Sequence, residues 1–206
     1  MNGMDGRPSR EELTARKPLV LELGCGPRKR DPKAVGIDVL DLPGVDIVDD
    51  ARAALEKFPD GSVDAIYSEH FLEHLEDPRR LLAEAARVLR PGGSFRAVVP
   101  HFSNPYFYSD PTHRAFYGLY TFGYWVERTP FRRNVPQYTT PIPLQLVSAR
   151  LTFQSSRPFY ARHALKKAAT FWVNWSRWTQ EFYEENLTTW IAVYEIDYIL
   201  VRQPAS

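Results

Sequence analysis

The side chains best suited to acid-base chemistry in this sequence gather in one segment, residues 101–127, which we call the aromatic segment. It reads HFSNPYFYSDPTHRAFYGLYTFGYWVE and holds two imidazoles, His101 and His113. An imidazole is the usual general base at neutral pH, and rings around it can exclude water. Asp110 stands three residues before His113 and could orient it. The residue types predict proton transfer at His101 or His113, with a structural turn packed on a sheet as the alternative.

Aromatic and basic residues around these histidines suggest an anionic or ring-bearing acceptor. Tyr106, Tyr108 and Tyr117 are candidate acceptor contacts. Between Arg128 and Gln180 the chain carries nine Lys or Arg and no acid, whereas residues 38–77 carry twelve acids against two bases. Arginines can bind phosphate bidentately. The candidates are Arg128, Arg132, Arg133, Arg150, Arg157 and Arg162. Two solvated faces that differ in charge are the plainer interpretation.

The first half of the chain must supply the elements that position these groups. Short apolar runs end in glycine or acidic residues, which is typical of buried parallel strands; they are LVLELGCG, AVGIDVL, VDIVDD, SVDAIYSEH and SFRAVVP. Residues 77–93 predict a helix with Asp77 as N-cap and Pro91-Gly92-Gly93 as its stop. The alternation predicts a mostly parallel, doubly wound α/β sheet with ligands at the carboxyl ends of its strands.

The second half predicts a strand at ARLTFQSS, one long helix over residues 161–186 and a closing, antiparallel C-terminal strand. We expect residues 1–17 to form a flexible segment and residues 18–206 to form one domain. Within it, residues 18–100 would bind a cofactor, residues 101–150 would form an acceptor lid, and residues 151–206 would complete the sheet.

The turn Gly24-Cys25-Gly26 predicts a nucleoside ligand without a pyrophosphate. The third glycine of a dinucleotide fingerprint is replaced by Lys29, and the next strand follows too soon for a long helix. Glycines let the backbone approach a ligand closely. Asp38, after the second strand, could accept bonds from both hydroxyls of a ribose.

Several motifs follow one another in register. They are Glu22-Leu23-Gly24-Cys25-Gly26-Pro27, Gly36-Ile37-Asp38, Asp50-Ala51, Phe58-Pro59-Asp60-Gly61-Ser62-Val63-Asp64-Ala65-Ile66, Phe71-Leu72-Glu73-His74-Leu75 and Arg87-Val88-Leu89-Arg90-Pro91-Gly92-Gly93. Over about residues 18–100 they resemble class I S-adenosylmethionine-dependent methyltransferases of the small bacterial-type, methyltransferase-11-like group. The resemblance implies a Rossmann-like fold, into which the aromatic segment would be inserted as a lid.

The resemblance also implies roles for individual residues. Asp38 would bind the ribose, Asp50 the adenine amino group, and Ala51 would pack on the adenine ring or offer its amide. Glu22 would orient the loop Gly24-Cys25-Gly26. The residues after the fourth strand would contact the methionine part and the transferring methyl; these are Ser68, Glu69 and His70, the last also a candidate base. His74 is interpreted as a capping or supporting residue.

We therefore expect a methyltransferase that uses S-adenosylmethionine to methylate a small, anionic or glycosylated acceptor, with a sugar hydroxyl favoured. The alternatives are an RNA or protein methyltransferase and a non-catalytic partner subunit. A net charge of +1 disfavours a dedicated nucleic-acid binder. One cysteine and scattered histidines predict no metal site.

The lack of a long apolar run or a signal-like start predicts a cytoplasmic protein without a membrane span. We expect a monomer or a homodimer. The tryptophan-rich stretch RHALKKAATFWVNWSRW could lie on a membrane surface, or pack in the core or a dimer.

Overall fold

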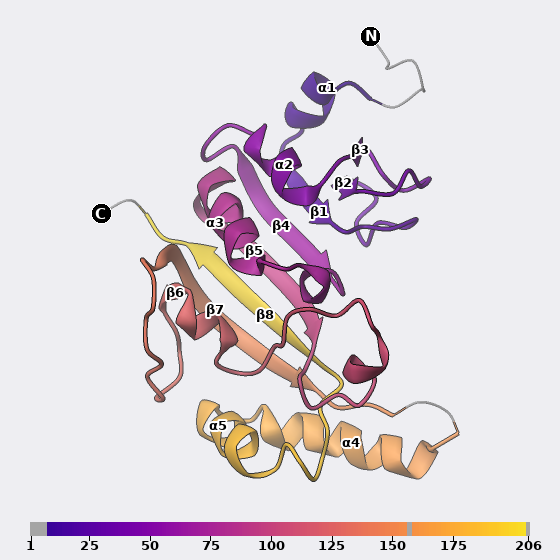
Figure 1. Ribbon diagram of the computed structural model, residues 1–206, viewed down its shortest axis with the longest axis vertical. Helices are drawn as coiled ribbons and strands as arrows, with labels where there is room; N and C mark the ends of the chain where they lie inside the picture. The colour runs from indigo at the N-terminus through magenta and orange to yellow at the C-terminus, as the bar shows by residue number, and fades with distance from the viewer. Residues whose placement is uncertain (1–7, 156–157, 205–206) are drawn as a thin grey trace.

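The computed structural model describes residues 8–155 and 158–204. Eight strands form one sheet in the order β3-β2-β1-β4-β5-β8-β7-β6, which Figure 1 shows as a twisted layer. The strands are β1 (Val20–Leu23), β2 (Val35–Asp38), β3 (Ile47–Val48), β4 (Val63–Glu69), β5 (Leu89–Pro100), β6 (Val126–Arg128), β7 (Ile142–Thr152) and β8 (Glu195–Arg202). The helices are α1 (Arg10–Thr14), α2 (Ala51–Glu56), α3 (Pro78–Val88), α4 (Tyr160–Val173) and α5 (Arg177–Asn186), with short 3-10 turns η1 (Leu72–His74), η2 (Phe107–Ser109) and η3 (Thr121–Tyr124).

Strands β1 to β5 are all parallel, as the apolar runs predict. Leu21, Leu23, Val35 and Ile37 are fully buried, because both faces of this part of the sheet are covered. Helix α3 begins where predicted: the Asp77 side chain accepts the backbone N–H of Arg80 at 3.2 Å. The parallel half therefore has all its carboxyl ends at one edge.

The predicted antiparallel C-terminal strand is confirmed. β8 runs antiparallel to both β5 and β7, and β6 joins β7 in parallel at the far edge. Arg96 on β5 and Asp197 on β8 form a bidentate ion pair, at 2.9 and 2.7 Å. β8 therefore joins the parallel half of the sheet to β7 and β6.

The start of the chain differs from the flexible segment expected over residues 1–17. Residues 1–7 lie outside the described residues, but Ser9 caps α1 with a capping box. Leu13 on this helix is 1% exposed and belongs to the core. A single buried leucine, supported by the cap, anchors the short helix against the sheet.

The long helix expected over residues 161–186 is two helices, α4 and α5. They break at Asn174, whose side chain accepts the N–H of Leu151 at 2.9 Å and donates to the Leu151 carbonyl at 2.7 Å. Ser176 then caps α5 with its own capping box. The break ties both helices to the end of β7, across which α4 lies in Figure 1.

The aromatic segment lies against the carboxyl ends of β4 and β5. The backbone N–H groups of Arg114 and Ala115 donate to the carbonyl of Glu73 at 2.7 and 3.1 Å. Several of its bulky residues are core residues; Phe107, Tyr117, Leu119 and Phe122 are at most 3% exposed. Burial of these rings explains why the segment is richer in aromatics than an ordinary loop.

Candidate functional site

The glycine turn after β1 faces open space. Gly24 and Gly26 have positive φ angles of 64° and 55°. The N–H of Gly24 donates to the carbonyl of Ile37 and that of Gly26 to Oδ2 of Asp38, both at 2.9 Å. A Cβ on Gly24 would lie 2.5 Å from the Phe71 ring, whereas one on Gly26 would meet nothing within 4 Å. Space for a ligand therefore lies beside Gly26, at the ends of β1 and β2.

Glu22 and Cys25 support this turn from inside. Both carboxylate oxygens of Glu22 accept the backbone N–H of Arg30, at 3.0 and 2.9 Å. Burial raises the pKa of Glu22, opposed by the backbone N–H bonds it accepts. Burial, with the nearby charges of Asp38 and Glu22, raises the pKa of the Cys25 thiol to about 12. Glu22 thus holds the backbone at Arg30, which follows the glycine turn, and Cys25 stays a protonated packing residue.

Asp38 and Asp50 lie at successive strand ends. Asp38 uses Oδ1 to accept the N–H of Leu40 at 2.9 Å, and each of its oxygens retains a second lone pair for a hydroxyl donor. Asp50 is exposed and caps α2 by accepting the N–H of Ala53 at 3.0 Å. Ala51, 4% exposed, opens that helix, which the sequence analysis did not predict. Asp38 and Asp50 are thus fixed by backbone donors and reachable from outside.

The end of β4 brings Ser68, Glu69 and His70 to the same edge. Ser68 lies opposite Leu23 in the sheet register, is fully buried, and has no hydrogen-bond partner for its hydroxyl among the described residues. Glu69 bonds to the Tyr67 hydroxyl and pairs with Arg30 at 3.2 Å. A buried hydroxyl without a partner beside the glycine turn is a group that a bound ligand could satisfy.

His70 is held between two carboxylates. Its Nδ1 lies 3.4 Å from Oε1 of Glu73, and its Nε2 lies 3.4 Å from Oε2 of Glu195 at the start of β8. Hydrogen bonding to Glu195 and Glu73 raises the pKa of His70 to about 10. Both ring nitrogens therefore face carboxylates, and the ring offers no lone pair to an acceptor's proton.

His101 lies inside the protein. It is fully buried; its Nε2 lies 3.1 Å from Oε2 of Glu184 on α5, and its Nδ1 accepts the backbone N–H of Ser103 at 3.1 Å. Nε2 must therefore carry the proton and donate to Glu184. The strand-end position suggested a site role from sequence, but the ring connects the aromatic segment to α5 and does not reach the edge.

His113 keeps one nitrogen for chemistry. Its Nδ1 lies 2.9 Å from the carbonyl of Phe107, so it donates there and leaves a lone pair on Nε2. Asp110 lies 3.7 Å from that Nε2 and accepts both the N–H and the hydroxyl of Thr112. These Thr112 bonds lower the pKa of Asp110. Asp110 therefore holds the turn through Thr112, and the Phe107 carbonyl holds the His113 ring.

The three candidate tyrosines divide into two kinds. Tyr106 and Tyr108 are 57% and 66% exposed, and the Tyr108 ring lies 6.2 Å from the exposed ring of Phe116. Tyr117 is fully buried and its hydroxyl donates to the carbonyl of Leu72 at 3.2 Å, so it is a core residue and cannot contact an acceptor. Desolvation raises the pKa of Tyr117 well above its usual value.

Glutamates of α5 bind two of the arginines in the basic stretch, residues 128–180. The backbone N–H groups of Arg132 and Arg133 both donate to Glu181 at 3.0 Å, and the Arg133 guanidinium pairs with Glu185 at 3.1 Å. Both arginines follow β6, the edge strand farthest from β3 in the sheet order. Arg157 lies outside the described residues. The arginine pair is therefore remote in the sheet from the glycine turn.

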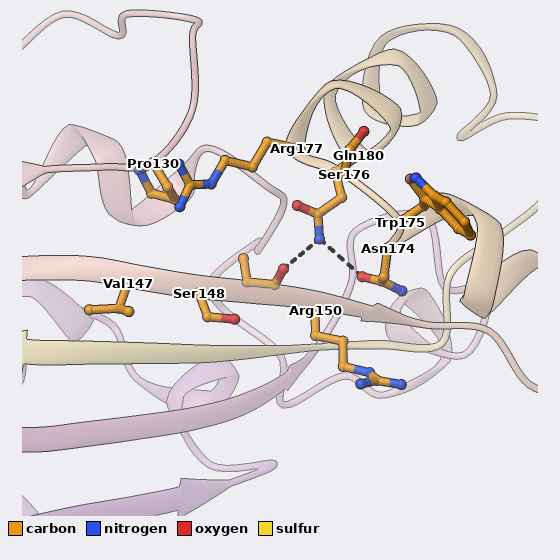
Figure 2. A pocket seen from close by; sticks show the side chains of 10 residues that line it. Pro130, Val147, Ser148, Arg150, Asn174, Trp175, Ser176, Arg177 and Gln180 are labelled. Atoms are coloured by element: carbon orange, nitrogen blue, oxygen red, sulfur yellow. Dashed lines mark hydrogen bonds between the residues drawn. The ribbon is translucent and has the colours of Figure 1, made fainter.

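A cavity of about 490 Å³ opens between β7 and the start of α5 (Figure 2). Gln180 crosses it to donate to the Ala149 carbonyl at 2.6 Å and to Asn174 at 3.0 Å. Its charged lining residues are Arg150 and Arg177. Strands β4, β5 and β8 separate β7 from β1, so this cavity is not part of the glycine-turn site.

Comparison with known proteins agrees with this arrangement of strands and turn. Residues 37–97 match the family model described as a methyltransferase domain. The match runs from the end of β2 into β5, and it supports the resemblance of this part of the chain to class I S-adenosylmethionine-dependent methyltransferases. Their cofactor is S-adenosylmethionine, and the edge of this chain fits it, with space beside Gly26, free lone pairs on Asp38 and an unpartnered Ser68 hydroxyl.

The curated relative that this chain matches is similar over only part of its length. An uncharacterized 37.1 kDa protein in transposon TN4556 of Streptomyces fradiae is 31% identical over 118 residues, which cover 45% of this chain and 31% of that protein. This chain thus spans under a third of that relative.

Solved structures share the fold. A SAM dependent methyltransferase from Archaeoglobus fulgidus has a TM-score of 0.56 at 16% identity, over 94% of this chain and 95% of that one. A chain from the complex between the Haloferax volcanii Trm112 methyltransferase activator and a methyltransferase has a TM-score of 0.52 at 18% identity, over 95% of this chain and 89% of that one.

Among the described residues of this chain, none of the helices has the length and apolar character needed to span a membrane.

Proposed function

We propose that this chain transfers the methyl group of S-adenosylmethionine to a hydroxyl of a small, anionic or glycosylated acceptor, with a sugar favoured. The observation that carries the proposal is the open space beside Gly26, whose N–H donates to Asp38 at the end of β2. S-Adenosylmethionine, when bound, supplies an electrophilic methyl on a sulfonium. Asp38 would hold the ribose hydroxyls, and Asp50 with Ala51 the adenine.

On the acceptor side, His113 is the histidine we assign to proton removal. Its Nε2 retains a lone pair, and the ring is fixed through the Phe107 carbonyl. Methylation of an acceptor hydroxyl releases its proton, and Nε2 of His113 would accept that proton. Tyr106 and Tyr108, both exposed, could cover the acceptor and exclude water.

The cofactor assignment is tested by calorimetry with S-adenosylmethionine. Asp38→Ala should weaken binding at least roughly tenfold, since it removes charge-assisted bonds. Glu56→Ala, an exposed carboxylate on α2, is the matched control and should bind as the wild type does. Binding that is unchanged in Asp38→Ala contradicts the assignment.

The acceptor assignment is tested by turnover with a panel of sugar and nucleotide-sugar acceptors. His113→Asn should lower kcat while cofactor affinity stays the same. The alternatives are an RNA or protein acceptor, for which binding should fall steeply with salt, and a chain that acts with a protein partner. The fold likeness to the chain in the Trm112 complex makes the second arrangement testable: activity would then be absent from the purified chain alone.

The outer face of α4 supports a second proposal, docking on an anionic membrane surface. The residues of α4 that face the sheet are small or polar: Lys166 donates to the Gln154 carbonyl at 3.0 Å and Thr170 accepts the N–H of Phe153 at 3.0 Å. Ala169 and Val173 also pack against the core, but the large apolar side chains of α4 are exposed by 61% or more, as are two tryptophans outside it. These exposed side chains include Leu165, Phe171, Trp172, Trp175 and Trp190. Helix α4 has no acidic residue.

Tryptophans and leucine beside lysine and arginine suit the boundary of an anionic bilayer. Sedimentation with vesicles of phosphatidylcholine and phosphatidylserine should bind the wild type, and Trp172→Ala with Trp175→Ala should reduce the bound fraction. Tyr138→Ala, 78% exposed elsewhere, is the control. If the tryptophan variants instead dissociate a homodimer and vesicles bind nothing, this face is a subunit interface and the membrane proposal is wrong.

A further inference from the structure

Three side chains that could bind a metal ion meet between η1 and the aromatic segment. One carboxylate oxygen of Glu73 and one ring nitrogen each of His74 and His113 all lie within 4.8 Å of one another. The rings of the two histidines are 4.9 Å apart and inclined by 61°. The backbone bonds from Arg114 and Ala115 to the Glu73 carbonyl hold the two segments together. The cluster is thus part of the fold and does not depend on long, mobile side chains.

Hydrogen bonding leaves the same nitrogen free on both rings. The Thr112 hydroxyl donates its hydrogen to Asp110 at 2.6 Å, so it can only accept from Nδ1 of His74, which lies 2.9 Å away. Nδ1 of His113 donates to the Phe107 carbonyl. Each ring therefore has its Nε2 lone pair available. A metal-binding histidine characteristically donates its other N–H to an oxygen in this way.

The burial of Glu73 is a second, independent observation that points to a ligand here. Glu73 is 1% exposed, and its Oε2 has no hydrogen-bond partner among the described residues. Its other oxygen, Oε1, lies 3.4 Å from Nδ1 of His70. A buried carboxylate oxygen without a partner is unfavourable, and a metal ion is one of the groups that can satisfy it.

We propose that Glu73, His74 and His113 bind one divalent transition-metal ion. Two imidazoles and one carboxylate are a ligand set used for zinc and for iron(II), cobalt(II) and similar ions. Three protein ligands leave at least one coordination position open, as catalytic metal sites do. His74 is exposed and gives the ion a route from solvent. The sequence predicted no metal because one ligand is far along the chain from the other two.

The role of the ion in methyl transfer rests on the cofactor site of the proposed function above, and it would replace the proton removal assigned there to His113. An acceptor hydroxyl bound at the open position would lose its proton more readily. Nε2 of His113 would then be a ligand, and the proton would leave to solvent. Metal binding itself does not depend on this role, and it can be measured without any acceptor.

The experiment is calorimetry of Zn²⁺ with chelator-treated full-length protein, repeated with Co²⁺ and visible absorption. We expect one ion per chain. His74→Asn and His113→Asn should each weaken Zn²⁺ binding by more than about tenfold, and Thr112→Val, which removes the bond to Nδ1 of His74, by roughly tenfold. His163→Asn is the matched control, because that imidazole lies outside the cluster, against Ser155, and should leave affinity unchanged.

Two results would overturn the proposal: the absence of one-to-one binding, or equal affinities in His74→Asn and His163→Asn. His74 is exposed, so its variant should fold even if Glu73→Gln does not. S-Adenosylmethionine titrated into the metal-free protein separates the two proposals. Cofactor binding without metal binding refutes only the ion, whereas metal binding without cofactor binding refutes only the methyltransferase site.

Discussion

Gly24 and Gly26 offer a matched pair of alanine substitutions in one turn. Both residues have positive φ, so alanine at either position costs roughly 1–2 kcal/mol of backbone strain. They differ in surroundings. The new Cβ at position 24 would lie 2.5 Å from Cγ and Cδ2 of Phe71, whereas at position 26 it would meet no atom within 4 Å. Overpacking of this kind adds about 1–3 kcal/mol.

Gly26→Ala should therefore lose roughly 1–2 kcal/mol of unfolding free energy, and Gly24→Ala roughly 2–5 kcal/mol. Urea denaturation measures both, and each kcal/mol should lower the Tm by roughly 2–4 °C in a chain of this size. Cofactor affinity should respond differently: a methyl on Gly26 enters the space assigned to S-adenosylmethionine, so calorimetry should detect a clear loss there.

A double variant isolates the clash. Adding Phe71→Ala to Gly24→Ala removes the opposing ring, so the combined destabilisation should be smaller than the sum of the two single effects. If Gly24→Ala is as stable as Gly26→Ala, the Phe71 ring does not lie over the turn as described. If Gly26→Ala binds S-adenosylmethionine with wild-type affinity, the space beside Gly26 does not receive the cofactor.

Three further substitutions or reactions follow from buried groups. His101→Ala leaves Oε2 of the buried Glu184 unpaired, and urea denaturation should show a loss of roughly 3 kcal/mol with cofactor affinity unchanged; unchanged stability would argue against the buried pair. Asn174→Ala removes the bonds to Leu151 and should cost roughly 2–3 kcal/mol in the same assay. With its pKa raised from 9.0 to about 12, the Cys25 thiol should react with a disulfide reagent at pH 8 about a thousandfold more slowly in the native protein than in urea. Comparable rates would show that the thiol is exposed or ionised.

The cofactor edge was predictable because its information is local. Each strand of the parallel half is a short apolar run that ends in a turn residue, and the carboxyl ends of parallel strands meet at one edge. Asp38 and Ser68 could therefore be placed together from sequence, although they are far apart in the chain. Helix α3 was also predictable, because Asp77 caps its start and a proline-glycine sequence follows its end.

The roles of the aromatic segment were not predictable, because they depend on distant partners. The partner of His101 is Glu184 on α5, and the partner of the Tyr117 hydroxyl is the carbonyl of Leu72. His70 has a carboxylate partner in Glu195, at the start of β8. The break between α4 and α5 likewise depends on the backbone of β7. In each case a residue type suited to chemistry or to a continuous helix was reassigned by a tertiary contact that leaves no local pattern.

Glu184 has a consequence for how this enzyme family could change its acceptor. One of its oxygens pairs with His101 and the other accepts the N–H of Leu119 at 2.7 Å. A single carboxylate on α5 thus fastens both ends of the intervening chain, in the manner of the neck of an Ω-loop. Substitutions at exposed positions between these two points, such as Tyr106 and Tyr108, can alter the surface offered to an acceptor, while the buried Phe107 and Tyr117 keep the loop packed on the core. Selection for new acceptors would therefore act on the exposed positions of this loop and not on the buried ones.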